Sequence, residues 1–570
     1  MKRPDARPHT KTLRLRAVIC VIFPLVAFVG PVAAAALDNL SLVIGATTYR
    51  IPHLTIEGGD PAMLAGVFQS DAAGIETRLA GLSARRIVIP ELLTETRAGE
   101  TVERALYRDL ILGDVVNGRV GVAQAATAEQ SVEVSSGRES HLVWRGLALR
   151  GVDLRQLAHI AAASAPETAA PSKPLLDEET IDSVAYESQS GDVSLHAGRL
   201  TLTGVTARAR GAAPVSPADR MKHLTQVADD VSFARFEIQD IVVEGRVPSE
   251  PAPFALRIGK IDLRGLARGT LAETTLDHFA LKTPDGGNVT LTQFNLRDVA
   301  LATLFDGGMP HIGHAGLKEL VVDLPTPQSG AESRMRFRLA DANLDLANFR
   351  ERTPTKFSLA IDRLFVDLAA RGATGLAAPL LALGYRDIDL SASVAGAWDE
   401  KTGAFTLAPV RVTAPEMGAA SLAATFGDVS ALAFSSSPLV ARTAAATASV
   451  KSLELMLDGG GLADRLIASS AKASPSAEEK SRADATQAAR DLIAQNLGAG
   501  PNAARIGDAV ADYLRAPQQL HLRLAGKPSI NALDMLARKP ADILEGLEVE
   551  ASSRANEPAP SPQPRPQPTP

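Results

Sequence analysis

The chain has 570 residues, a formal net charge of −6 and a single cysteine, and 4% of its residues are aromatic. That length is sufficient for a sizeable buried core in one or several domains. The acidic balance, with arginines scattered among acidic residues, argues against binding of nucleic acid through phosphate contacts, and the few aromatic residues argue against stacking surfaces for bases or sugars.

The first element in chain order is a basic and then apolar segment. Residues 1–16 carry six basic side chains against one aspartate, and residues 17–37 contain no charged or polar side chain except the thiol of Cys20. Gly30 and Pro31 interrupt the apolar stretch just before an alanine run, which places small residues where signal peptidase requires them. We therefore expect residues 1–36 to be a cleaved signal peptide and the chain to be exported to the periplasm.

A second interpretation of this segment stays open. Because 21 apolar residues can span the roughly 30 Å of bilayer hydrocarbon as a helix, residues 17–37 would then anchor the chain in the inner membrane with its body in the periplasm. Removal of residues 1–36 would leave a chain with no cysteine and a formal net charge of −11. Disulfides and cysteine-based catalytic or metal sites are then excluded.

Short alternations of apolar and polar residues, broken by Gly, Asp, Asn and Pro, follow this segment and predict strands and turns. One spacing recurs, in which large apolar side chains occupy relative positions 0, 2, 5 and 7. Because side chains alternate between the two sides of a strand, the four can share one face only if the central step is a β-bulge or a sharp corner. Eight strict copies begin at Tyr49, Leu142, Phe236, Leu256, Phe294, Leu359, Leu383 and Phe405.

The predicted fold is mainly β, with a long bulged or coiled antiparallel sheet, short interspersed helices and a C-terminal α-helical subdomain. The sheet can be an open groove or a sandwich, and both architectures stay open. We expect an N-terminal β region at residues 37–163, a proline-containing linker at 164–180 and the main β region at 181–457. Asp60-Pro61 and Ser216-Pro217 each predict a short helix, because a capping side chain precedes a proline at the first helical position.

Residues 458–556 are predicted to be rich in α-helix. A capping box at Ser476 and Glu479 opens a helix that should end near Gly498, and a second helix should begin at Pro501. Residues 520–524 alternate as in a strand, and 530–538 should form another helix.

The last residues have a different composition. Residues 557–570 contain seven prolines, which cannot donate backbone hydrogen bonds to a helix or a sheet. We expect this segment to be a disordered, solvated tail of polyproline type.

No motif of the sequence predicts catalysis or cofactor binding. His311 and His314 lie three residues apart beside Gly and Pro, but no third ligand is near them in the sequence, so we expect a surface loop there. Residues 398–403, 285–288 and 458–461 have the composition of turns and lack the glycine spacing of a phosphate-binding loop. We expect that the protein is not an enzyme and has no catalytic residue, cofactor or metal.

The repeated apolar runs at residues 236–243, 256–263, 294–301 and 383–412, behind an N-terminal membrane signal, resemble the AsmA-like envelope proteins of Gram-negative bacteria. The resemblance extends over roughly residues 40–455. It implies a long, curved β-groove with an apolar lining and an association with outer-membrane lipid homeostasis and lipid movement. The residues that we expect to form an apolar-ligand face are Phe236, Ile238, Leu256, Ile258, Phe294 and Leu296.

Two functions stay open. The first is a structural or assembly role in the periplasm, with an envelope protein as the partner. The second is binding or transfer of a lipid or another apolar ligand through an AsmA-like groove, with peripheral membrane contact; neither function involves nucleic acid. A strand-lined apolar face open to solvent favours the second function, whereas a closed sandwich filled by side chains favours the first.

We predict that the mature chain begins at Leu37, because the alanine run is the cleavage site of the export signal. Intact-mass measurement on protein from the periplasmic fraction checks this prediction. A chain that keeps residues 1–36 and partitions with the inner membrane contradicts it and establishes the anchor.

Overall fold

The computed structural model divides into two compact units, which are described separately. Unit 1 comprises Met1–Arg246 and Lys260–Ala272, and unit 2 comprises Val247–Gly259 and Glu273–Pro570. The tail at 557–570 and most of the expected signal peptide lie outside the described residues. The structure describes residues 35–554 except 45, 69–73, 99–100, 135–136, 164–169, 189–191, 210–227, 247–249, 251, 306–310, 327–333, 369–376, 472–474 and 532–537.

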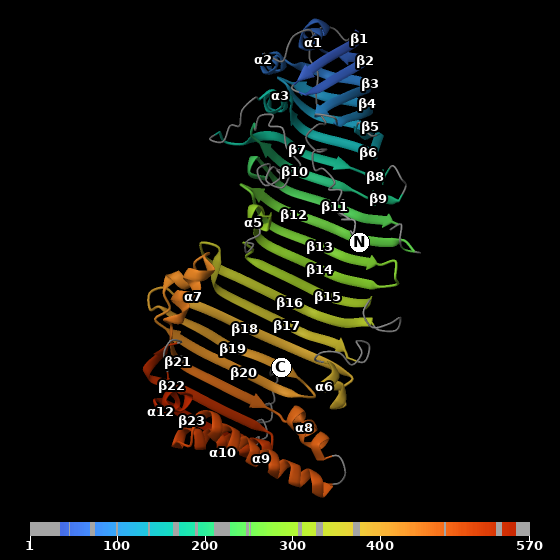
Figure 1. Cartoon of the computed structure of the whole chain (residues 1–570). Coiled ribbons are helices and arrows are strands. Elements are labelled where there is room, and N and C mark those ends of the chain that lie inside the picture. The colour runs from blue at the N-terminus through green and yellow to red at the C-terminus, as the bar shows by residue number, and fades with distance from the viewer. Residues whose placement is uncertain are drawn as a thin grey trace, which may run out of the picture. The chain divides into compact units, whose positions relative to one another are not determined.

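Long antiparallel strands dominate both units (Figure 1). Short helices lie between them, and the longest helices are near the C-terminus, at 475–497 and 501–515. The predicted fold class is therefore confirmed: the protein is mainly β, with long bulged antiparallel strands, interspersed short helices and a C-terminal helical region.

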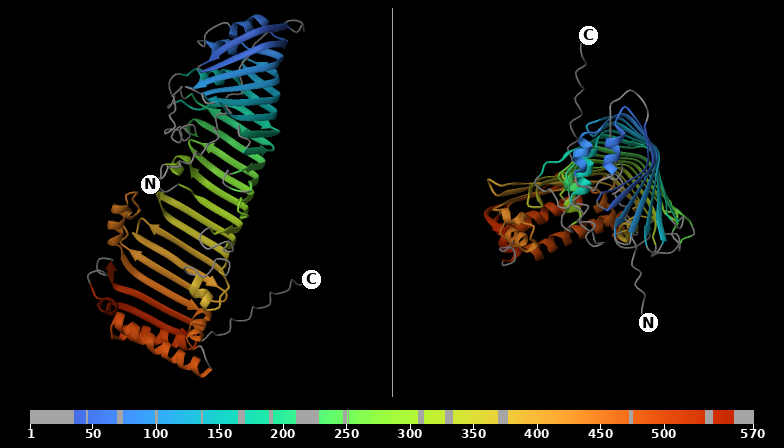
Figure 2. Two further views of the ribbon diagram at one scale, coloured as in Figure 1. Left: turned by 45° about the vertical axis from the view of Figure 1, so that its right-hand side comes forward. Right: turned by 90° about the horizontal axis from the view of Figure 1, so that it is seen from above.

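Unit 1 begins with strands that pair with their sequence neighbours and bend along their length (Figures 1 and 2). Its elements are β1 (Ala35–Ile44), β2 (Thr47–Glu57), α1 (Pro61–Phe68), α2 (Ile75–Ala80), β3 (Ser83–Ala98), β4 (Thr101–Val116), β5 (Arg119–Val134), β6 (Gly137–Asp153), α3 (Leu154–Ala162), β7 (Lys173–Ile181), β8 (Ser183–Ser188), β9 (Val193–Ala197), β10 (Leu200–Ala207) and β11 (Val231–Gly245). Strands β12 (Phe254–Ala267) and β13 (Thr270–Lys282) contribute residues to both units.

The core of unit 1 lies between its first strands and helices α1, α2 and α3. The strand side chains that it buries completely include Ile51 and Leu54 of β2 and Ile87 of β3, and the helices bury Leu64 and Leu79. Asp60 starts α1 as predicted, since its carboxylate accepts a hydrogen bond from the amide of Ala62. The first strands of unit 1 therefore enclose a closed core.

Unit 2 continues the antiparallel pattern, and each strand pairs with the next one along the chain. Its elements are β14 (Asn288–Ala300), α5 (Leu301–Phe305), β15 (His314–Pro325), β16 (Arg334–Arg350), β17 (Thr353–Asp367), α6 (Ala377–Ala382), β18 (Asp387–Asp399), β19 (Ala404–Ala414), β20 (Gly418–Gly427), η3 (Ala431–Phe434), α7 (Pro438–Ala446), β21 (Ser449–Asp458), α8 (Gly461–Ala471), α9 (Pro475–Leu497), α10 (Pro501–Arg515), β22 (Gln519–Asn531), α12 (Pro540–Glu545) and β23 (Leu547–Arg554).

The predicted corners are present at several of the repeated apolar runs. The second residue of the central step has a left-handed backbone at Gly146 (φ 67°), Asp240 (φ 52°), Asp298 (φ 55°) and Arg363 (φ 50°). Glycine adopts this conformation freely and aspartate tolerates it, because its short side chain bonds to the local backbone. The two apolar pairs of these runs can therefore share one face of a bent strand.

The runs that begin at Phe405 and at Leu383 have different backbone structures. The pairing of β19 with β20 shifts register between Leu407 and Val410, which is the bulge predicted for the run that begins at Phe405. In the run at Leu383, the first two apolar residues precede β18, so the prediction of a strand corner there is wrong. Tyr385 packs instead in a small core with Leu368 and α6.

The expected linker at 164–180 is not a linker throughout. Residues 173–181 form β7, which pairs with β6 and β10, and the units divide near residue 246 instead. The acidic run Asp177-Glu178-Glu179 concealed the strand, because charged residues are uncommon in buried strands. The expected helix at 530–538 is also wrong at its start, because β22 extends to Asn531. Most of its remaining residues lie outside the described residues, and so does the helix expected at Ser216-Pro217.

We predict that Ile51→Ala lowers the free energy of unfolding by about 2 to 5 kcal/mol, because Ile51 is fully buried and its removal leaves a cavity. Denaturant titration of the purified protein measures this loss. Val43→Ala on the adjacent strand is the control, since Val43 is 55% exposed, and it should change the free energy by less than about 0.5 kcal/mol. Equal losses in both variants would contradict a closed core in unit 1.

Candidate apolar-ligand face

Antiparallel pairing places large apolar side chains of unit 2 in rows on one face of the sheet. Residues directly opposite each other in an antiparallel pair project to the same side, so Phe294 shares a face with Leu317, and Leu344 shares it with Leu359. We call this surface the unit 2 apolar face. Its large residues over β14–β20 are Phe294, Leu296, Leu317, Leu344, Leu346, Phe357, Leu359, Ile361, Val394, Leu407, Val410, Val412 and Leu422.

The intervening residues of the same strands are polar. Gln293, Asn295 and Arg297 alternate with Phe294 and Leu296 along β14 and therefore project to the other side. The same alternation holds in the neighbouring strands. The residues there that project to the same side as Gln293 and Asn295 are Lys318, Asp341, Asn343, Asp362, Ser393 and Arg411. The sheet in this part of unit 2 thus has one apolar and one polar face.

Most of the unit 2 apolar face is neither fully buried nor fully exposed. Its large side chains over β14–β20 are half-buried, and Val412 is 39% exposed. Helix α10 covers the continuation of the face over β21–β23, where Ile506 and Tyr513 pack against Leu457, Leu520 and Leu522 among others. The face is therefore a packed core at its C-terminal strands and a partly open surface over β14–β20.

Aromatic rings gather at one end of this face. The ring of Phe405 lies 6.4 Å from Phe357, 6.3 Å from Phe426 and 6.5 Å from Phe434 of η3. A Cβ atom at Gly396 would come within 2.6 Å of the Phe357 ring and 2.9 Å of the Phe405 ring, so a larger residue on β18 would displace these two rings from their present positions. The sequence analysis identified Phe405 as the start of an apolar run but missed this cluster.

The remaining predicted face residues are also half-buried. In unit 1, Phe236 lies opposite Leu202 and Ile238 lies opposite Leu200, so β11 extends an apolar face that begins in β10. In unit 2, Leu256 and Ile258 flank the exposed Arg257 on β12 and share a side of that strand. All six predicted residues are thus intermediate between core and surface.

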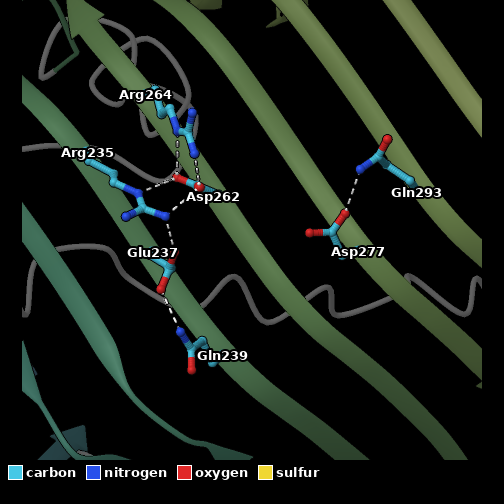
Figure 3. A network of polar contacts seen from close by, with 7 residues as sticks. All are labelled: Arg235, Glu237, Gln239, Asp262, Arg264, Asp277 and Gln293. Atoms are coloured by element: carbon cyan, nitrogen blue, oxygen red, sulfur yellow. Dashed lines mark hydrogen bonds and ion pairs between the residues drawn. The ribbon is translucent and has the colours of Figure 1, made fainter.

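On β11 the polar residues between these apolar ones form a paired network (Figure 3). Asp262 accepts hydrogen bonds from Arg235 at 2.7 and 2.9 Å and from Arg264 at 2.8 Å, and Arg235 also bonds to Glu237. The Asp262 side chain is 3% exposed, and the Arg235 guanidinium lowers the pKa of the Asp262 carboxyl to about 2. Because Arg235, Glu237 and Gln239 alternate with Phe236 and Ile238, this network fixes the orientation of β11 and directs the apolar side chains to the other side.

The apolar side of unit 1 includes a buried carboxyl group. Glu179 of β7 is opposite Leu149 of β6 and opposite Leu202 of β10, and it is 2% exposed. Its Oε2 atom has no hydrogen-bond partner among the described residues. Burial raises the pKa of Glu179 to about 8, so the group is neutral at pH 7. Glu179 lies in the segment at 164–180 that its prolines and charged residues predict to be a linker, so it does not stand out in the sequence.

The histidine pair of the sequence analysis does not converge on one point. His311 stacks on Phe349 with ring centroids 3.8 Å apart, whereas Nδ1 of His314 lies 2.7 Å from Asp345 Oδ1. Over the described ranges, no group of three or more His, Cys, Asp or Glu side chains could hold a metal ion.

A separate cavity of about 810 Å³ opens in unit 2. Its lining includes the charged residues Glu319, Arg338, Arg363, Asp389 and Glu416, and none of the six predicted face residues. Arg363 is paired with Asp389 at 3.0 Å, and the Arg338 guanidinium lies 4.7 Å from the Phe365 ring centroid. Arg338 and Arg363 therefore each already interact with another side chain of the protein.

Comparisons with known proteins add little to this geometry. A family model described as "Uncharacterized protein" matches residues 411–554, which run from β19 to the end of β23 and include the helical region. No curated protein and no solved structure matches the chain. None of the helices within the described residues is long and apolar enough to cross a membrane.

We predict that the protein becomes less stable as the pH rises from 4.5 to 8, partly because of Glu179. The unfolded carboxyl ionises near 4.5, whereas the folded one keeps its proton up to about 8. The folded state therefore holds the extra proton in this interval, and the free energy of unfolding falls by on the order of 3 to 5 kcal/mol.

Glu179→Gln should remove this part of the pH dependence, which denaturant titrations between pH 4.5 and 8 measure. Glu178→Gln is the matched control. Glu178 occupies the adjacent position and pairs with Arg150 at 3.5 Å, so this variant should leave the dependence of the free energy of unfolding on pH unchanged. An unchanged slope in Glu179→Gln sinks the prediction.

Proposed function

We propose that the protein binds the hydrocarbon part of lipids or similar apolar ligands along its apolar strand faces in the periplasm. The observation that carries this proposal is that large apolar side chains form rows on the unit 2 apolar face over β14–β20 and are only partly buried there. Soluble proteins rarely expose a contiguous apolar surface of this extent unless it contacts a ligand, a membrane or another protein.

The dimensions of the face suit an acyl chain. Adjacent strands lie roughly 4.8 Å apart, so the seven strands β14–β20 present a surface roughly 30 Å across, comparable to the hydrocarbon thickness of a bilayer. Each methylene group that leaves water for such a surface contributes about 0.8 kcal/mol when fully buried. A chain of more than ten carbons could therefore bind through hydrophobic contact alone, even with partial burial.

The resemblance to AsmA-like envelope proteins supports the same proposal, because that family is associated with lipid movement through apolar β-grooves. An export signal at residues 1–36 would place the face in the periplasm, between the two membranes that exchange lipid. We propose no catalytic step.

A structural or assembly role remains the second candidate. Leu432, Leu439 and Val440 are 59%, 76% and 39% exposed on η3 and α7. Such a cluster suits contact with a protein partner better than capture of a single chain, because it is small and lies on two short helices.

Aspartate substitutions on the predicted face test the proposal. We expect Phe294→Asp and Leu296→Asp, and equally Phe236→Asp, Ile238→Asp, Leu256→Asp and Ile258→Asp, to reduce co-purified lipid at least several-fold, because a charge there must be desolvated by the ligand. The melting temperature should fall by less than about 4 °C, since the side chains are half-exposed. Lipid extraction with mass spectrometry and thermal unfolding are measured on the same samples.

Asn295→Asp is the matched control, because it changes the opposite face between the same two positions and should leave lipid content unchanged. A wild-type protein without lipid, together with unfolding of every face variant, identifies the face as ordinary core and favours the assembly role.

A further inference from the structure

The apolar face of unit 1 contains one hydrogen-bonding group in an otherwise aliphatic and aromatic row. Cross-strand pairing aligns Leu149, Glu179, Leu202 and Phe236 on β6, β7, β10 and β11. The next row has Ile181, Leu200 and Ile238. Glu179 therefore projects from the same side of the sheet as Phe236 and Ile238, two residues of the proposed ligand face.

Burial decreases along this row. Leu149 is 1% exposed, Glu179 2% and Leu202 5%, whereas Phe236 is half-buried. Glu179 thus lies where the closed core of unit 1 gives way to the partly open face. Two strand spacings, roughly 10 Å, separate it from Phe236, a distance that the end of an acyl chain lying over Phe236 can reach.

Among the residues that the structure describes, no charged group accounts for a carboxyl at this position. On its own strand, Asp177 bonds to Arg119 and Glu178 pairs with Arg150. Among the described residues, Glu179 takes part in no ion pair, and its Oε2 atom has no hydrogen-bond partner.

The helix that packs against β7 also offers no partner. The charged side chains of α3 are occupied elsewhere, since Arg155 bonds to Asp153 and His159 bonds to Glu76. A buried polar group without a partner is costly and usually marks a functional constraint or a missing ligand.

We propose that Glu179, in its protonated form, donates a hydrogen bond to the carbonyl oxygen of an acyl chain that lies on the unit 1 apolar face. The ligand class is a hydrocarbon chain that ends in an ester or a carboxylic acid. This proposal rests on the proposed function and deepens it, because it assigns a polar contact to the buried end of the apolar row. Fixed polar groups of this kind set ligand orientation and specificity.

The test compares three radiolabelled probes of matched chain length, hexadecane, methyl palmitate and palmitic acid, on the full-length protein at pH 6.5. The wild type should bind methyl palmitate about tenfold more tightly than hexadecane, which is the effect of one hydrogen bond in an apolar site. The palmitic acid measurement shows whether the free acid or the ester is preferred.

Three variants separate the hydrogen bond from its surroundings. Glu179→Leu keeps the volume and removes the donor, so methyl palmitate should bind only as tightly as hexadecane. Glu179→Gln keeps a donor and should retain most of the preference. Leu202→Ile, which leaves the carboxyl in place, should keep the full preference.

The pH dependence supplies a second readout. As the pH rises well above the pKa of about 8, the wild-type carboxyl loses the proton that it would donate, so its preference for methyl palmitate should disappear, whereas that of Glu179→Gln should persist. Loss of folding is not a concern for Glu179→Leu, since it replaces an unpaired buried carboxyl by an apolar side chain; an unchanged or higher melting temperature confirms this.

The outcomes are distinguishable. If the wild type binds hexadecane and methyl palmitate equally, or if Glu179→Leu keeps the preference, the role of Glu179 is wrong and the proposed function stands. If the wild type binds none of the three probes, the proposed function fails and this inference fails with it.

Discussion

The structure depends on the way its strands turn without exchanging their two faces. Side chains alternate along a strand, so the odd spacing between the two apolar pairs of a run would place them on opposite sides unless the bend inserts one residue. At Asp240, Asp298 and Arg363 the left-handed backbone occupies this inserted position. Large apolar residues on both sides of the bend can then line a single surface, and the charged residues on both sides can line the other.

The same two-sided arrangement produces both a core and an open surface. Where helices α1, α2 and α3 lie over the first strands, the apolar side is sealed and side chains such as Ile51 are fully buried. Over β14–β20 the equivalent side chains are only half-buried. Hence the apolar side of the strands is closed where helices cover it and partly open where, among the described residues, they do not.

Much of this fold could be predicted from the sequence. The spacing of the repeated runs implied bent strands with one apolar side, and the corners at Asp240 and Asp298 follow directly from it. The helices that begin at Pro475 and Pro501 were also predictable, since proline and capping residues mark their starts and Gly498 ends the first. Local signals of this kind do not require knowledge of distant contacts.

The features that the sequence did not predict depend on distant contacts. Strand β7 was hidden because Asp177 and Glu178 find arginine partners on other strands, and Glu179 is buried only by the neighbours that pairing brings to it. Likewise, the close packing around Gly396 arises from two phenylalanine rings that are 48 residues apart in the chain, Phe357 and Phe405. Neither fact leaves a local trace in composition or periodicity.

The neighbour-to-neighbour pairing of unit 2 has a consequence for how this unit folds. Because β14 to β23 each pair with the next strand along the chain, most native contacts there close short loops, and such topologies fold faster than those with distant pairings. Each hairpin can add to the one before it, as repeats add in a solenoid. Amide hydrogen exchange in such an array is expected to vary from strand to strand, with the slowest exchange beneath α10 and the fastest over the strands that no helix covers.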